Sequence, residues 1–159
     1  MTIPDKIGDF TTRQTVSVDF INIGNDVIES GYDNIGRFVN NLFVIDEAVT
    51  VLHDGKVQGI GGFVALWEGV AECWSIWTVS AGKSHRRSMV QSARLVNEDY
   101  VERHKIWRVQ ATLKDGLPSN WMKHIGFEPE GVLRNYCMDG NNAIMYSRIY
   151  KEHLKLKVV

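Results

Sequence analysis

The sequence predicts a single α+β domain built on one mixed, mostly antiparallel sheet that is flanked by helices. Runs of apolar and polar residues alternate at the two-residue period of strands, and three segments between them have the three- and four-residue spacing of helices. Asp-Gly pairs at 54–55 and 139–140 are typical of tight turns between strands. At 159 residues the chain has the length of one domain. We take 1–159 as that domain, with a core over about 14–150 and an accessory tail over 151–159.

The first elements predicted are a strand over 16–21 and a helical segment over 27–42. Apolar and polar residues alternate in the first of these. The second places apolar side chains at helical steps, but Gly31 and Gly36 interrupt it. Because glycine weakens a helix interior by about 1 kcal/mol, a kinked helix or two short helices fit this segment.

Three antiparallel strands and a helix are predicted next. Residues 49–53 and 57–66 flank Asp54-Gly55, a strong hairpin signal. A turn at 67–69 leads into the strand predicted over 70–80, which is rich in β-branched and aromatic residues. A helix then runs to about His104.

The last third of the chain predicts a strand, a helix and two strands. Residues 106–113 alternate as a strand with one buried face. The helix after them ends at Gly126, where a left-handed C-cap is expected, with Phe127 folded back over the last turn. The final two strands are expected on either side of a turn at Asp139-Gly140.

This order carries a family resemblance. A strand, a helix, the pattern Gly-Phe-x-x-Glu-Gly-x-x-Arg-x-Tyr over 126–136, a turn, and x-x-Tyr-x-Arg over 144–148 resemble the C-terminal half of the GCN5-related N-acetyltransferase (GNAT) superfamily. The branch that acetylates protein N-termini and ribosomal proteins is the most similar. The resemblance implies acetyl-CoA as co-substrate, no metal, and direct transfer of acetyl to an amine of a protein or small molecule.

The same resemblance implies where acetyl-CoA binds. Its pantetheine pairs with the end of the fourth strand, which splays from the fifth (109–111), and its pyrophosphate lies at the next helix N-terminus, where unpaired N–H groups favour anions. The residues this places at the cofactor are Trp77, Thr78, Val79, Gly82, Lys83, Ser84, His85, Arg86 and Arg87, with 80–87 as a loop. The family's usual loop, Gln or Arg followed by x-x-Gly-x-Gly or Ala, is absent and only Gly82 remains. Asp115 replaces an asparagine that contacts pantetheine in relatives, or forms a simple turn with Gly116.

Two residues are candidates for catalysis. Acetyl transfer to an amine needs a base for the ammonium proton and commonly an acid for the leaving thiolate. Family members often hold a glutamate where this chain has Glu72, although the side chain is also compatible with an ordinary outward-facing carboxylate. In relatives the general acid is frequently a tyrosine in the helix before Gly-Phe, where this chain has Met122 and Lys123. Tyr136, in the strand that follows, is a candidate substitute or a packing residue.

A second resemblance gives an alternative of another class. From about Trp77 to Ile149 the pattern also resembles a small internal virion protein of T7-like bacteriophages, which shares the shortened loop. The alternative is therefore a GNAT-fold protein with impaired catalysis that acts as a structural or interaction protein. A virion or host-interaction partner, or a homodimer, would fit it, in the virion or the host cytoplasm.

Other function classes are not indicated. The net charge of −1 provides no general attraction to nucleic acid or to a membrane surface. No apolar run approaches the roughly 18 residues of a membrane span, and the first six residues lack an apolar signal region. Cys73 and Cys137 are read as free thiols in a reducing compartment, which favours the cytoplasm. The five histidines show no spacing typical of a zinc site.

Two glycine patterns resemble nucleotide-binding motifs only in part. Gly82-Lys83-Ser84 matches the end of a P-loop, but Trp77 stands where the first glycine belongs. Gly59-Ile60-Gly61-Gly62 lies inside a predicted strand and opens no helix, so a bulge or a close backbone approach is favoured over a dinucleotide site.

Overall fold

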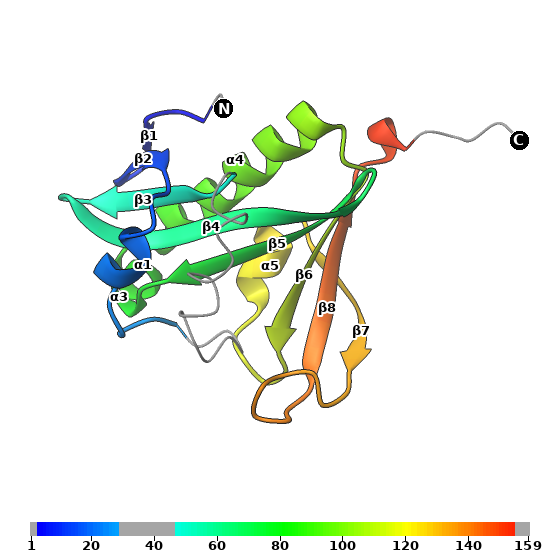
Figure 1. Cartoon of the computed structure of the whole chain (residues 1–159). Coiled ribbons are helices and arrows are strands. Elements are labelled where there is room, and N and C mark those ends of the chain that lie inside the picture. The colour runs from blue at the N-terminus through cyan, green and yellow to red at the C-terminus, as the bar shows by residue number, and fades with distance from the viewer. Residues whose placement is uncertain (1–2, 29–46, 155–159) are drawn as a thin grey trace, which may run out of the picture.

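The sheet is mixed and mostly antiparallel, as predicted. The computed structural model describes residues 3–28 and 47–154, and within them eight strands form one sheet in the order β1-β2-β3-β4-β5-β6-β8-β7 (Figure 1). Neighbouring strands are antiparallel except β5 and β6, which are parallel. The strands are β1 (Lys6–Ile7), β2 (Phe10–Gln14), β3 (Val49–His53), β4 (Lys56–Trp67), β5 (Val70–Trp77), β6 (Arg108–Lys114), β7 (Glu128–Leu133) and β8 (Ala143–Ile149).

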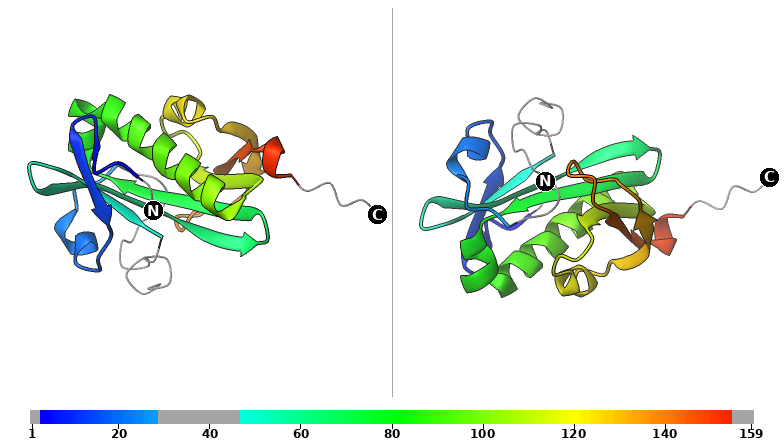
Figure 2. Two further views of the ribbon diagram at one scale, coloured as in Figure 1. Left: turned by 90° about the horizontal axis from the view of Figure 1, so that it is seen from above. Right: turned by 90° about the horizontal axis from the view of Figure 1, so that it is seen from below.

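The helices lie on both faces of the sheet. They are α1 (Asp19–Asn22), α3 (Val79–Ser84), α4 (Arg86–His104), α5 (Asn120–His124) and a 3-10 helix (Lys151–His153). Figure 2 shows α4 and α5 on one face and α1 on the other. None of the helices within residues 3–28 and 47–154 has the length and apolarity of a membrane span.

The largest apolar cluster lies between the C-terminal strands and the helices α4 and α5. Val109 and Phe127 are fully buried there, and the rings of Phe63 and Tyr100 stack at 3.9 Å. Residues of β6 alternate between buried and partly buried, as the sequence pattern predicts. A second cluster around Phe20 and others lies toward α1, and a third cluster packs β2 and β5 against α4.

Local turn and cap signals are confirmed where the pattern was strongest. His53 pairs with Lys56 across the Asp54-Gly55 turn. Gly126 has a φ of 89° and its N–H donates to the Lys123 carbonyl at 3.0 Å, while the Phe127 N–H donates to the Met122 carbonyl at 3.0 Å. These two bonds form a Schellman cap, which ends α5 and turns Phe127 into the core.

The glycines of β4 make room for tryptophans. A Cβ on Gly59 would lie 2.3 Å from the Trp77 ring, and a Cβ on Gly62 would lie 2.9 Å from the Trp74 ring. The close backbone approach favoured by the sequence is therefore confirmed, and these glycines serve packing rather than a dinucleotide.

The strand predicted over 16–21 is wrong. The strand lies earlier, at Phe10–Gln14, and residues 19–22 form the one-turn helix α1. Val16 and Val18 are half exposed, so the alternating pattern does not mark a buried strand face. Phe10 is fully buried although it precedes the core expected from residue 14.

A buried carboxylate explains this difference. Asp19 is fully buried and accepts two hydrogen bonds from the Arg13 guanidinium, at 2.6 and 2.7 Å. It also accepts from the Val16 N–H and the Thr50 hydroxyl, each at 2.9 Å. Burial raises the pKa of Asp19, but these hydrogen bonds and the charge of Arg13 outweigh it and hold the pKa below its ordinary value. The bonds bend the chain after β2 and prevent an extended continuation.

Two other boundaries differ from the prediction. The strand expected over 70–80 ends at Trp77, because residues 79–84 form α3. The Asp139-Gly140 turn lies inside a longer connection over 134–142, which joins β7 to β8. Residues 29–42 of the predicted helical segment lie outside the described residues. Val27 at its start is extended and bridges to Thr78.

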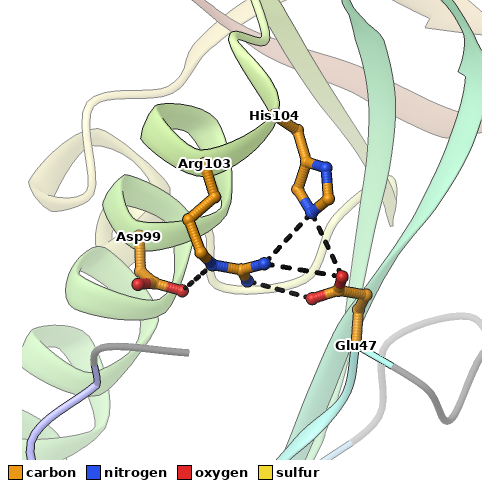
Figure 3. A network of polar contacts seen from close by, with 4 residues as sticks. All are labelled: Glu47, Asp99, Arg103 and His104. Carbon is orange, nitrogen blue, oxygen red and sulfur yellow. Dashed lines mark hydrogen bonds and ion pairs between the residues drawn. The ribbon is translucent and has the colours of Figure 1, made fainter.

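A polar network joins the end of α4 to the segment that enters β3 (Figure 3). The Arg103 guanidinium donates to Asp99 at 2.8 Å and to Glu47 at 2.9 Å, and a ring nitrogen of His104 lies 3.1 Å from Glu47. Partial burial raises the pKa of Glu47, but Arg103 and His104 outweigh it and keep the pKa below its ordinary value. The network therefore ties the first half of the sheet to the long helix.

Candidate active site

The parallel strands β5 and β6 part halfway along their length, which confirms the predicted splay. Their register covers only Val70↔Arg108, Ala71↔Val109 and Glu72↔Gln110, although β5 continues to Trp77 and β6 to Lys114 (Figure 1). Each strand stays paired with its outer neighbour to its end, since Gly59 pairs with Trp77 and Ala143 with Lys114. A gap in the backbone ladder therefore opens beyond Glu72 and Gln110.

A cavity of about 400 Å³ lies beside this gap, among β5, β6 and the helices α3, α4 and α5. Its walls are largely apolar, with Trp77, Leu113 and Trp121 among them, and Lys83 and Arg86 bring two positive charges. The volume and the mixture of apolar walls with a few polar groups are typical of small-molecule sites. We call it the cleft. It is lined by Ile28, Ser75, Trp77, Val79, Gly82, Lys83, Arg86, Met89, Val90, Leu113, Pro118, Asn120, Trp121 and His124.

The structure brings together about half of the residues that the sequence predicted for the cofactor. Trp77, Val79, Gly82, Lys83 and Arg86 line the cleft. The other predicted cofactor residues do not line it: Thr78, Ser84, His85, Arg87 and Asp115.

The loop predicted over 80–87 is instead the helix α3, followed by a break at His85 and the start of α4. The Thr78 hydroxyl accepts from the Ala81 N–H at 3.1 Å and so caps α3. The same hydroxyl donates to the Gln58 side chain at 3.1 Å. Thr78 therefore has a structural role, because an N-cap side chain replaces a missing helical partner.

His85 contacts the first strands rather than the cleft. Its Nδ1 lies 2.9 Å from an Asp9 carboxylate oxygen, and its ring lies 5.5 Å from Phe10 and 4.3 Å from His53. The hydrogen bond with His85 is the main cause of the lowered pKa of Asp9. The His85 side chain thus connects the start of α4 to the β1–β2 turn.

The backbone edge of β5 at the cleft is occupied by the chain itself. Thr78 donates its N–H to Gln58 at 2.9 Å, toward β4. Since successive residues of a strand direct their backbone groups to opposite edges, the Trp77 carbonyl and the Val79 N–H face the gap. There the Ile28 N–H donates to Trp77 at 2.8 Å and Val79 donates to the Asp26 carbonyl at 2.9 Å. The edge that the resemblance assigns to pantetheine is thus held by residues 26–28.

Glu72 lies at the point where the strands part. It is partly buried, and an Oε2 of its carboxylate lies 3.5 Å from the Gln110 side-chain nitrogen. Ala71 and Cys73 pack in the cluster beneath α4, so Glu72 points to the opposite face. Burial, with a smaller effect of Glu72, raises the pKa of Cys73 to about 12, which agrees with a buried structural thiol.

Tyr136 lies outside the predicted strand, and Asp115 lies in a turn rather than in the cleft. Tyr136 is not in a strand, because β7 ends at Leu133, and its side chain is 54% exposed in the 134–142 connection. Asp115 is exposed just after β6 and donates its N–H to the Asn142 carbonyl at 2.9 Å. Of the two roles predicted for Asp115, a pantetheine contact or a turn with Gly116, the structure shows the turn.

Helix α5 contributes to the cleft, which was not predicted from the sequence. Asn120, Trp121 and His124 line it from that helix. The signal was present, because a helix that follows the splayed strand must start beside the gap. Within the described residues no group of three or more His, Cys, Asp or Glu side chains could hold a metal ion.

Comparisons with known proteins connect this geometry to a fold family. No protein-family model matches the sequence, and no curated protein matches it significantly. Solved structures do match. A GNAT-family acetyltransferase from Bacillus anthracis has a TM-score of 0.66 at 15% identity, over 91% of this chain and 96% of the other. The ribosomal-protein-S5-alanine acetyltransferase from Vibrio fischeri has a TM-score of 0.70 at 11% identity, over 94% and 98%.

A third structure contains the co-substrate. It is a GNAT-superfamily phosphinothricin acetyltransferase from Sinorhizobium meliloti in complex with acetyl-CoA, with a TM-score of 0.64 at 14% identity, over 89% of each chain. At these identities the likeness concerns the fold. The chain has the fold of the GNAT acetyltransferases.

Proposed function

We propose that this chain is an acetyl-CoA-dependent N-acetyltransferase that transfers acetyl to an amine of a protein or small molecule. The observation that carries the proposal is the parting of β5 and β6 at Glu72 and Gln110, which places a carboxylate at the fork and a cleft beyond it. The GNAT fold and the acetyl-CoA complex of a structural neighbour support it.

The cleft residues fit the two ends of such a ligand. Lys83 and Arg86 suit phosphates, since charge-assisted hydrogen bonds to phosphate are strong. The 19-residue helix α4 begins at Arg86 without a side-chain cap, so its N-terminus favours an anion as well. Trp77, Leu113 and Trp121 suit the less polar arm. An arm that pairs with the β5 edge must displace residues 26–28.

The chain's own residues would then perform the following steps. When bound, acetyl-CoA supplies a thioester whose C–S bond breaks as the C–N bond to the amine forms. Glu72 accepts the proton that the attacking amine must lose, a contribution of roughly 10²–10⁴-fold in rate. Lys83 and Arg86 hold the phosphates and so fix the position of the thioester. Tyr136 is the candidate acid that protonates the leaving thiolate. We assign it a smaller contribution than Glu72, because its exposed hydroxyl lies in the 134–142 connection.

Calorimetry with acetyl-CoA and with CoA tests the binding step. We expect micromolar affinity for both. Thiol release with a panel of amines and N-terminal peptides tests the chemistry, where Glu72→Gln should reduce turnover about 100-fold or more and Tyr136→Phe much less. Fast turnover that is unaffected by Glu72→Gln would remove the assignment of the base.

A second function is favoured by a specific observation. Residues 26–28 hold the β5 edge, and Met122, 2% exposed, stands where relatives have a tyrosine. Both fit a GNAT-fold structural or interaction protein with impaired catalysis, such as a bacteriophage virion component, acting through a protein partner or a homodimer. A folded protein that binds no CoA at millimolar concentration would favour it, and light scattering would then identify a homodimer.

A further inference from the structure

We propose that Gln110 is a positioning residue for Glu72, and that Glu130 keeps the neighbouring Arg108 from pairing with the Glu72 carboxylate. The inference rests on the proposed function, because it concerns the state of the residue to which we assign the base. It adds a regulation of that carboxylate by three side chains that do not touch the cleft.

Gln110 lies opposite Glu72 where β5 and β6 part. It is the register partner of Glu72 in the last residue pair before β5 and β6 part. Val109 and Ala111 pack beneath α4, so Gln110 points to the same face as Glu72. Its side-chain nitrogen lies 3.5 Å from the Glu72 carboxylate, which is a long contact that substrate binding can tighten.

Arg108 fixes the orientation of the Gln110 amide. The Arg108 Nε donates to the Gln110 Oε1 at 3.2 Å. Because this bond uses the oxygen end of the amide, the NH₂ end faces Glu72. Arg108 is fixed in turn, since its two terminal nitrogens donate to Glu130 at 2.6 and 2.7 Å. The Ser147 hydroxyl donates to the same carboxylate at 2.5 Å, which anchors the chain of contacts on β8.

The positive charge of Arg108 is directed to Glu130 and not to Glu72. Val70 pairs with Arg108 and Glu72 with Gln110, so Arg108 is a diagonal neighbour of Glu72 within reach of a long side chain. A guanidinium paired with Glu72 would stabilise its charged form and weaken it as a base. Glu130 occupies that guanidinium instead. Hydrogen bonds from Arg108 and Ser147 lower the pKa of Glu130 to about 2, so Glu130 stays charged and keeps Arg108 engaged at neutral pH.

The remaining charged groups near Glu72 do not replace this control. Across β4 its register partner is the apolar Val64. Cys73 points to the other face and its raised pKa keeps the thiol neutral. Among the described residues, the other charged groups of the adjoining elements are Glu68 in the β4–β5 turn, Lys56 at the far end of β4, and Lys114, which is paired with Asp139, at the end of β6. Gln110 thus supplies a neutral donor between Glu72 and the nearest cation.

The experiment follows the titration of Glu72 by carbon-13 NMR of its carboxyl group, assigned by the loss of the signal in Glu72→Gln. We expect Gln110→Glu to move the midpoint upward by about one pH unit, because a second carboxylate then faces Glu72. Glu130→Gln should move it downward, because Arg108 is released. Gln91→Glu on the exposed face of α4 makes the same chemical change as Gln110→Glu at a distant position and should leave the midpoint unchanged.

The activity arm uses acetyl-CoA with the peptide panel. Gln110→Met, which keeps the side-chain length but has no donor, should lower kcat about tenfold and leave KM for acetyl-CoA within twofold. Midpoints that do not move in either variant, or that move in the same direction, would overturn the inference. If the wild type binds acetyl-CoA but acetylates nothing, the proposed function fails, while the NMR titration still decides the coupling between Gln110, Glu130 and Glu72.

Discussion

The two halves of the sheet are stabilised by different kinds of interaction. The first half, β1–β4 with α1, adds to its smaller apolar clusters long-range polar contacts, such as the pair of the buried Asp19 with the partly exposed Arg13 and the network of Glu47 and Arg103. The second half, β6–β8 with α5, surrounds an apolar cluster in which Phe127 and Val109 are fully buried. Apolar alternation and caps act within a few residues, whereas Asp19 accepts a hydrogen bond from Thr50, 31 residues away. Sequence patterns therefore predict the second half well, whereas in the first half they predict the β3–β4 hairpin but not the strand β2 or the helix α1.

The cleft lies where the two halves meet. Strand β5 is joined to the first half through β4 and through residues 26–28, while β6 and α5 belong to the second. Separate substitutions in each half and at their junction can test whether this division is real.

The largest effect is expected in the apolar half. Phe127→Ala removes a fully buried ring from the main cluster and should lower the free energy of unfolding by about 4 kcal/mol. Chemical denaturation measures this loss. Val132→Ala, at a half-exposed position of β7, is the control and should change stability by less than about 0.5 kcal/mol. A small loss in Phe127→Ala would show that this half does not depend on its apolar cluster.

The polar half should respond to a change that preserves shape. Asp19→Asn weakens the hydrogen bonds that the buried carboxylate accepts from Arg13, Val16 and Thr50 and should lower the free energy of unfolding by about 2 kcal/mol. Asp54→Asn makes the same change at an exposed turn position and should be nearly neutral. Equal stability of the two variants in denaturation would contradict the role given to Asp19.

At the junction, two adjacent arginines should differ. Arg86 lines the cleft and Arg87 does not. Because a charge-assisted phosphate contact contributes about 2 kcal/mol, Arg86→Ala should weaken CoA binding about 30-fold. Arg87→Ala should weaken it less than threefold. Calorimetry of the two variants compares them directly, and similar affinities would show that long-range charge rather than contact attracts the phosphates.

The strand edge at the junction gives a smaller effect in the opposite direction. Ile28→Pro removes the N–H that donates to Trp77, which weakens the hold of residues 26–28 on β5 by about 1 kcal/mol. Affinity for CoA should then increase about fivefold. Ile28→Ala keeps the N–H and controls for the lost side chain. Weaker binding in the proline variant alone would mean that residues 26–28 support the cofactor rather than compete with it.

The smallest effect is expected for a surface pair of the second half. The pKa of Glu130 falls from 4.5 to about 2 on folding, so its ion pair with Arg108 stabilises the protein above pH 4.5, and this contribution is lost as the pH falls toward 2. Since Glu130 is 41% exposed, the contribution should be under about 1 kcal/mol. Glu130→Gln should therefore flatten the decline of stability over this range, and an unchanged slope in acid denaturation would contradict it.

The sequence by itself determined the fold class and the elements whose signals are local. The hairpin at Asp54-Gly55, the long helix ending at His104 and the cap at Gly126 each depend on residues within a turn or two of one another. The resemblance in the last third then supplied the splay of two strands and the basic residues that follow β5, of which Lys83 in α3 and Arg86 in α4 do line the cleft.

Only the tertiary structure decided which of those side chains meet. His85 contacts Asp9, 76 residues away, and does not line the cleft, whereas its neighbour Arg86 does. Residues 26–28 reach the β5 edge, and Arg108 lies between Gln110 and Glu130. These contacts join residues that are distant in sequence, and each follows from the packing of whole elements against one another. No periodicity or spacing along the chain encodes them, because a local pattern specifies which face a side chain occupies but not the partner it finds there.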